Sequence, residues 1–176
     1  MDAERGAPPD IRPGRLVRLG LVLTAPDERA RWAAMAERVG IEVLWTRPGE
    51  PAPQTVLPVR VLPDVDEPWA RTVPVVVGRS GAEAAALVEL AAGFAGYGDP
   101  RAGGLFGTLE ECQTQVARLA RDGVRDLRCV LPALPDVHDI LAQLPALVVG
   151  HPATHHPDAA RSADPQPPPW AARRER

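Results

Sequence analysis

The stretch VPVVVGRSGAEAAALVELA, residues 73–91, contains a complete strand, turn and helix. Its first five residues are apolar and mostly β-branched, which favours a strand that is covered on both faces. The turn Gly-Arg-Ser-Gly follows at 78–81, and the alanine-rich segment after it predicts a helix over about 81–92. We therefore expect a buried strand that leads through a short turn into a helix.

A second unit of this kind lies near the beginning of the chain. Residues 16–23, LVRLGLVL, predict a strand, and Asp27 directly precedes a helical segment that Gly40 ends. Residues 41–46, IEVLWT, predict a second strand after a very short connection. The order strand, helix, strand predicts two parallel strands joined by a right-handed crossover.

The remainder of the chain alternates in the same way after a long interruption. Residues 47–74 hold seven prolines and predict a long connection with an edge strand at most. Residues 94–98 predict a short strand or a turn, and the glycine-rich stretch at 99–107 precedes a helix from Thr108 to about Arg121. Thr108 and Glu111 have the spacing of a capping box. A strand at 126–131 and a helix from Asp136 follow, and we expect Pro145 to kink or end that helix early.

This pattern of four strands and four helices predicts an α/β fold with a parallel sheet. The predicted domain covers residues 15–150. Residues 1–14 and 151–176 are polar and rich in proline, so we expect both ends to be disordered.

Composition excludes several classes of protein. The chain of 176 residues has the length of one domain and a net charge of −3, and it lacks the basic and aromatic surface segments of nucleic-acid-binding proteins. It also lacks an apolar run of about 18 residues that could span a membrane, and its N-terminus does not resemble a signal peptide. We expect a cytoplasmic protein without a metal site, in which Cys112 and Cys129 are reduced and buried.

Three blocks of the sequence together resemble the luciferase-like family of flavin- and deazaflavin-dependent oxidoreductases. The blocks are RLGLVL with RWAAMAERVGIEVLW, then VPVVVGRSGAEAAALVELAAGFAGYG, and finally GTLEECQTQVARLARDGVRDLRCVLPALPDVHDILAQL. The third block is similar to the family's closing segment, with GTLEE in place of GTPEE. The resemblance implies a (β/α)₈ barrel and an oxidoreductase or monooxygenase that uses FMN or the deazaflavin F420 for hydride transfer or oxygen activation.

The chain is too short for the complete barrel of that family. A (β/α)₈ barrel usually needs about 250 residues, and here the proline-rich segment stands where the family has its central strands and helices. We therefore expect an incomplete or shortened barrel. A homodimer, or a pairing with a full-length relative, would cover the strand edges that such a barrel exposes.

The resemblance also implies a cofactor site at the turn of the opening stretch. By resemblance, Gly78, Ser80 and Gly81 contact the phosphate of the cofactor. Arg79 replaces the family's second glycine, and it either adds a cation or obstructs the close approach of the backbone. Thr24, at the end of the first strand, is a further candidate. The alternative interpretation is that Ser80 and Thr24 only cap local turns.

No catalytic residue can be predicted. Many members of the family carry an acidic residue and a histidine after the second strand, whereas this chain continues Arg47-Pro48-Gly49-Glu50. The alternative function is therefore a non-catalytic truncated relative that binds a cofactor or serves as a subunit partner. A gene remnant that does not fold stably is the third alternative.

Overall fold

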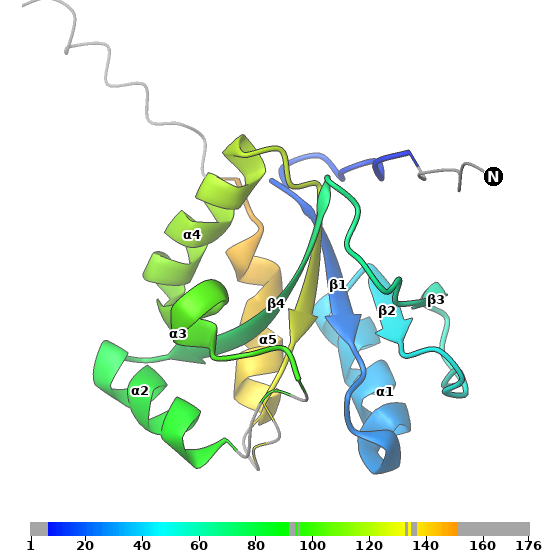
Figure 1. The fold of residues 1–176 in the computed structure, drawn as a ribbon, viewed down its shortest axis with the longest axis horizontal. Helices are drawn as coiled ribbons and strands as arrows, with labels where there is room; N and C mark the ends of the chain where they lie inside the picture. The colour runs from blue at the N-terminus through cyan, green and yellow to red at the C-terminus, as the bar shows by residue number, and fades with distance from the viewer. Residues whose placement is uncertain (1–6, 92–93, 95, 133, 135–136, 151–176) are drawn as a thin grey trace, which may run out of the picture.

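A parallel β-sheet forms the centre of the computed structural model, which describes residues 7–91, 94, 96–132, 134 and 137–150 (Figure 1). The strands are β1 (Arg18–Val22), β2 (Val43–Thr46), β3 (Val59–Val61), β4 (Ala70–Gly78), β5 (Leu105–Thr108) and β6 (Asp126–Val130). Their order in the sheet is β3-β2-β1-β6-β4-β5, and every neighbouring pair is parallel. The predicted α/β class with a parallel sheet is confirmed.

Helices lie on both faces of this sheet. The α-helices are α1 (Arg29–Val39), α2 (Gly81–Leu90), α3 (Pro100–Gly103), α4 (Leu109–Arg121) and α5 (Val137–Leu147), and a single 3₁₀ turn, η1 (Pro26–Glu28), precedes α1. Buried residues of α1, α4 and α5 belong to one apolar cluster, so these three helices cover the first face. Helix α2 packs against Val76 on the second face, because successive residues of β4 point to opposite sides.

The strand order differs from that of a segment of a closed barrel. The first strand, β1, does pair with the last, β6, as the first and last strands of a barrel do. In a barrel, however, strands that follow one another in the chain also lie side by side, whereas here β4 separates β5 from β6. Among the described strands, β3 and β5 are the two edge strands, and the sheet is open.

The first face holds the main hydrophobic core. Leu19 and Leu21 of β1, Val75 of β4 and Leu127 of β6 are completely buried there. Trp32 of α1 packs into the same cluster, and its indole nitrogen donates to Glu28 at 2.9 Å. Burial of apolar area is the main term that stabilises such a layered arrangement.

The second face is covered in part by the connection from β3 to β4. Residues 62–69 run from one end of the sheet toward its centre without forming a helix, and Leu62 packs against Trp45 and Val22. Gly20 of β1 makes room for the Trp45 side chain, since a Cβ atom there would lie 2.6 Å from Trp45 Nε1. The predicted long connection with an edge strand is therefore present, and it packs on the sheet.

Side chains satisfy backbone groups of the edge strand β5. At the β5 end, the side-chain amide of Gln115 accepts from the Phe106 N–H at 3.2 Å and donates to the Phe106 carbonyl at 3.0 Å. Glu111 accepts from the Thr108 N–H at 2.7 Å. A free edge strand is a template for pairing with other chains, so these side chains close the β5 edge.

Several expected elements agree with the observed ones and two were missed. The predicted capping box is confirmed, because Thr108 Oγ1 accepts from the Glu111 N–H at 3.3 Å. Of the two effects expected of Pro145, a kink or an early end of the helix, the early end is wrong, since α5 continues to Leu147. Proline has no backbone N–H and therefore removes one hydrogen bond of the helix. Only two residues of α5 follow Pro145, so this loss affects only the last turn. The two missed elements are α3 and β5, which begin in the glycine-rich stretch at 99–107 where the sequence predicts neither a helix nor a strand.

Candidate functional site

The turn that joins β4 to α2 lies at the edge of the sheet where the parallel strands end. Ser80 has an extended backbone and is the N-cap of α2, and its Oγ accepts from the Glu83 N–H at 3.2 Å. Gly78 lies so close to the helix that a Cβ atom there would be 2.5 Å from the Ala84 nitrogen. The glycine is therefore required by the tight passage from strand to helix. Gly81 faces open space.

Arg79 and Glu83 form an ion pair over this turn. The guanidinium donates to Glu83 Oε1 from Nη2 at 2.7 Å and from Nε at 3.0 Å, and the Arg79 backbone N–H also donates to the same carboxylate. Hydrogen bonds from Arg79 lower the pKa of Glu83 below its usual value. The Glu83 carboxylate thus takes one of the backbone N–H groups that an anion would use.

A cavity of about 460 Å³ lies beside the turn, between α2 and α5. Arg79, Glu83 and Leu87 line one side, and Asp139 and Gln143 line the other. The neighbouring strands β4 and β6 lead into helices on opposite faces of the sheet, and ligands of open α/β sheets commonly bind at such a point. Two carboxylates and one guanidinium make the described lining slightly acidic.

The fit of a phosphate to this turn depends on Glu83. The start of α2 offers the backbone N–H groups and the dipole that favour an anion, and Arg79 adds a cation whose side chain is 92% exposed. The Glu83 carboxylate already occupies the Arg79 N–H and guanidinium. A phosphate at this turn would therefore compete with that carboxylate for the Arg79 N–H and guanidinium.

Thr24 does not lie beside the turn. It comes two residues after β1, and β6 separates β1 from β4 in the sheet. Both groups belong to the same edge, yet Thr24 is half-buried at the end of β1, two strand positions from β4. The two parts of the predicted site are thus on the same side of the molecule without forming one cluster.

The acidic residue of the loop after β2, Glu50, holds the loop in place. Glu50 accepts from the Arg47 N–H at 3.1 Å and pairs with Arg29 Nη2 at 3.0 Å. Because Arg29 belongs to α1 and is largely buried, this pair fastens the loop to the helix. The carboxylate is already engaged by its partners.

Sequence reasoning missed a buried cluster of charges on the second face. Arg128 of β6 is completely buried, and its guanidinium pairs with Asp126 at 3.0 Å, Asp66 at 3.0 Å and Glu67 at 2.6 Å. The same guanidinium lies 4.0 Å from the centre of the Trp45 ring. The alternation of Asp126 and Arg128 with apolar residues in a buried strand was the available signal, because only paired charges are stable in an interior.

The two cysteines have the predicted state. Cys112 and Cys129 are free and buried. Burial raises the pKa of Cys112 to about 12 and also raises the pKa of Cys129. In the part of the chain that the structure describes, no group of three or more His, Cys, Asp or Glu side chains is arranged to hold a metal ion.

Comparisons of the chain with models of protein families, with curated proteins and with solved structures find no match. Among the described helices, none combines the length and the apolar character needed to cross a bilayer.

Proposed function

We propose that this protein is a shortened relative of the luciferase-like oxidoreductases that binds FMN or F420 by its phosphate at the turn 78–81. The observation that carries the proposal is the position of this turn, at the start of α2 and beside a cavity of about 460 Å³ that Arg79 also lines. Strand-to-helix turns of this form hold phosphates through backbone N–H groups and the helix dipole.

Each residue of the turn has a separate role in this proposal. Ser80 and Gly81 present backbone N–H groups to the phosphate, and Gly78 allows the strand to approach the helix closely enough. Arg79 exchanges the Glu83 carboxylate for the phosphate, because a guanidinium forms charge-assisted pairs with either group. The bound flavin or deazaflavin supplies hydride transfer or oxygen activation.

The shortened barrel is part of the same proposal. Pairing of β1 with β6, and the cover of one face by α1, α4 and α5, are the features that a barrel wall would retain. We infer that the connection 62–69 now covers the face that would line a barrel interior. Asp66 and Glu67 of this connection neutralise Arg128 on that face.

A non-catalytic role is the second candidate, and the loop after β2 favours it. The Glu50 carboxylate is held by Arg29 and by the Arg47 N–H, and the loop contains no histidine. A protein without an acid or base near pH 7 at this position would bind the cofactor without turnover. It would then act in the cytoplasm as a homodimer or as the partner of a full-length relative.

Equilibrium titration with FMN and with F420, followed by cofactor fluorescence, tests the proposal. Saturable binding with reduction or oxidation of the bound cofactor in the presence of a substrate supports the oxidoreductase. Binding without any turnover supports the second candidate, and the absence of binding to the folded protein contradicts both.

A further inference from the structure

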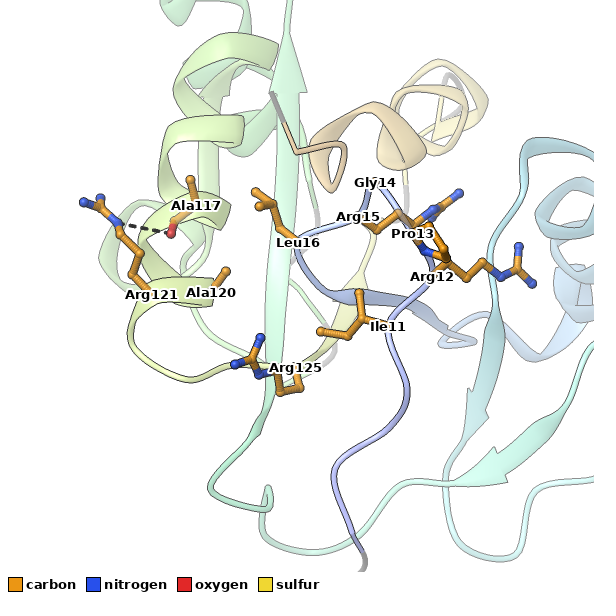
Figure 2. A pocket seen from close by; sticks show the side chains of 10 residues that line it. All are labelled: Ile11, Arg12, Pro13, Gly14, Arg15, Leu16, Ala117, Ala120, Arg121 and Arg125. Atoms are coloured by element: carbon orange, nitrogen blue, oxygen red, sulfur yellow. Dashed lines mark hydrogen bonds between the residues drawn. The ribbon is translucent and has the colours of Figure 1, made fainter. Parts of the chain in front are cut away.

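A wide, open cavity of about 660 Å³ lies at the opposite edge of the sheet, between the segment 11–16 and the end of α4 (Figure 2). The cavity is lined by apolar groups from both sides, with Ile11 and Leu16 from the N-terminal segment and Ala117 and Ala120 from α4. Figure 2 shows the side chains of Ile11 and Leu16 between the segment and the helix. The interior of this cavity is therefore apolar.

Four arginines surround this apolar interior. They are Arg12, Arg15, Arg121 and Arg125, and none of the described residues that line the cavity is acidic. Glu42 lies behind the N-terminal segment and pairs with Arg12 at 3.1 Å and with Arg15 at 3.2 Å. Because Glu42 partly neutralises Arg12 and Arg15, the positive charge of the lining is carried mainly by Arg121 and Arg125.

The two arginines on the α4 side retain free donors. Arg121 uses its Nε for the carbonyl of Ala117 at 3.4 Å, and neither of its Nη groups bonds to another described residue. The Arg125 side chain has no hydrogen bond or ion pair with another residue of the described chain, while its backbone N–H donates to the Trp69 carbonyl at 2.7 Å. A fixed backbone thus presents an unpaired guanidinium at the rim of the cavity.

The walls of the cavity are held in place by the surrounding backbone. The Leu16 N–H donates to the Val148 carbonyl at 2.8 Å, and the Gly150 N–H donates to the Gly14 carbonyl at 2.9 Å. The segment 11–16 is therefore attached to the residues that follow α5. A preformed cavity costs a ligand less ordering than one that must assemble around it.

We propose that this cavity binds a small organic acid with an apolar body, such as a medium-chain carboxylate. The apolar part fills the space between Leu16 and Ala120, and the anionic group pairs with Arg121 or Arg125. Small-molecule sites commonly combine an apolar lining with a few charged groups that fix the orientation of the ligand. This site is separate from the turn 78–81 and does not depend on the function proposed for that turn.

The test uses the full chain and the fluorescent probe 8-anilinonaphthalene-1-sulfonate, which has an apolar body and one anionic group. We expect saturable probe binding that octanoate reverses and that octanol, its neutral counterpart, does not. The double variant Arg121→Gln, Arg125→Gln should weaken probe binding at least tenfold. The double variant Arg38→Gln, Arg118→Gln removes the same charge from exposed positions of α1 and α4 outside the cavity, and it should leave binding unchanged.

Three results would overturn the proposal. They are no saturable binding, equal displacement by octanol and octanoate, and equal loss of affinity in the two double variants. If the cavity variant does not fold, hydrogen exchange of the wild-type protein decides. Octanoate must then slow exchange within residues 11–16 and 117–125, and slowing elsewhere alone contradicts the site.

Discussion

The buried guanidinium of Arg128 on β6 lies 3.0 Å from the carboxylate of Asp66 in the connection between β3 and β4. These residues are 62 positions apart in the chain, and their contact fixes the proline-rich connection to the second face of the sheet. Asp66 also accepts from the Thr72 N–H at 2.6 Å and from its hydroxyl at 2.8 Å. The pair therefore joins β6, the connection and the beginning of β4.

Arg128→Met should destabilise the protein strongly. The substitution leaves Asp126, which is also buried, without the guanidinium that faces it, although Arg18 still pairs with it at 2.8 Å. Removal of one partner from a buried ion pair costs about 3–5 kcal/mol. The free energy of unfolding in urea measures the loss, with the exposed Arg101→Met as control. A loss below about 1 kcal/mol, as for surface pairs, would contradict the structural role of the cluster.

Gly20→Ala should destabilise the protein, whereas Gly81→Ala should not. A Cβ atom at Gly20 would lie 2.6 Å from Trp45 Nε1, and Trp45 is only 3% exposed and cannot easily move. Overpacking of this kind costs about 1–3 kcal/mol. Thermal unfolding of the two variants gives the comparison. Equal stability of both would mean that Trp45 does not pack over Gly20 in solution.

Gln115→Ala should open the β5 edge. It removes the side chain that satisfies both backbone groups of Phe106, and each lost hydrogen bond costs about 1 kcal/mol. Light scattering over a range of protein concentrations should show stronger self-association than for Gln143→Ala, which removes an amide bonded to its own helix. The account of the closed edge fails if both variants have the same mass in solution.

Stability should fall as the pH rises above about 8.5, the usual pKa of a thiol in an unfolded chain. The pKa of Cys112 is raised to about 12 in the fold, so the unfolded state loses its thiol proton first and alkaline pH favours unfolding. Urea midpoints measured between neutral and alkaline pH should show this decline. Replacement of both cysteines by alanine should reduce it, and an unchanged slope would exclude the thiols as its cause.

The sequence predicts most of the fold because the apolar strands and their helix signals are local. The strand at 73–77 and the capped helix after Thr108 are examples, and the structure extends the first to Ala70–Gly78. The order of the strands depends on contacts between distant parts of the chain and cannot be predicted from local patterns. This order places Asp126 and Arg128 beneath the connection 62–69, which is far away in the sequence. For β5, three glycines at 103, 104 and 107 obscured a four-residue strand whose edge depends on Gln115.

The turn at 78–81 was predicted from the sequence, whereas the ion pair of Arg79 with Glu83 over that turn was not. The turn Gly78 to Gly81 follows from the pattern of the chain, and so does the cap by Ser80. The sequence also places Glu83 four residues after Arg79, but helical ion pairs of this spacing are common and usually carry little meaning. Only the structure brings the carboxylate onto the Arg79 backbone N–H, where it competes with an anion.

The most direct test of the proposed cofactor site compares the affinity of the wild-type protein for FMN and F420 with that of Glu83→Gln. Removal of the competing charge should tighten binding of the cofactor that fits, and Arg79→Gln should weaken it. Arg71→Gln, at the far end of β4, should have no effect. Tighter binding by Glu83→Gln would show that the turn holds the phosphate. Equal affinity of all four proteins, or no binding by any of them, would contradict the site.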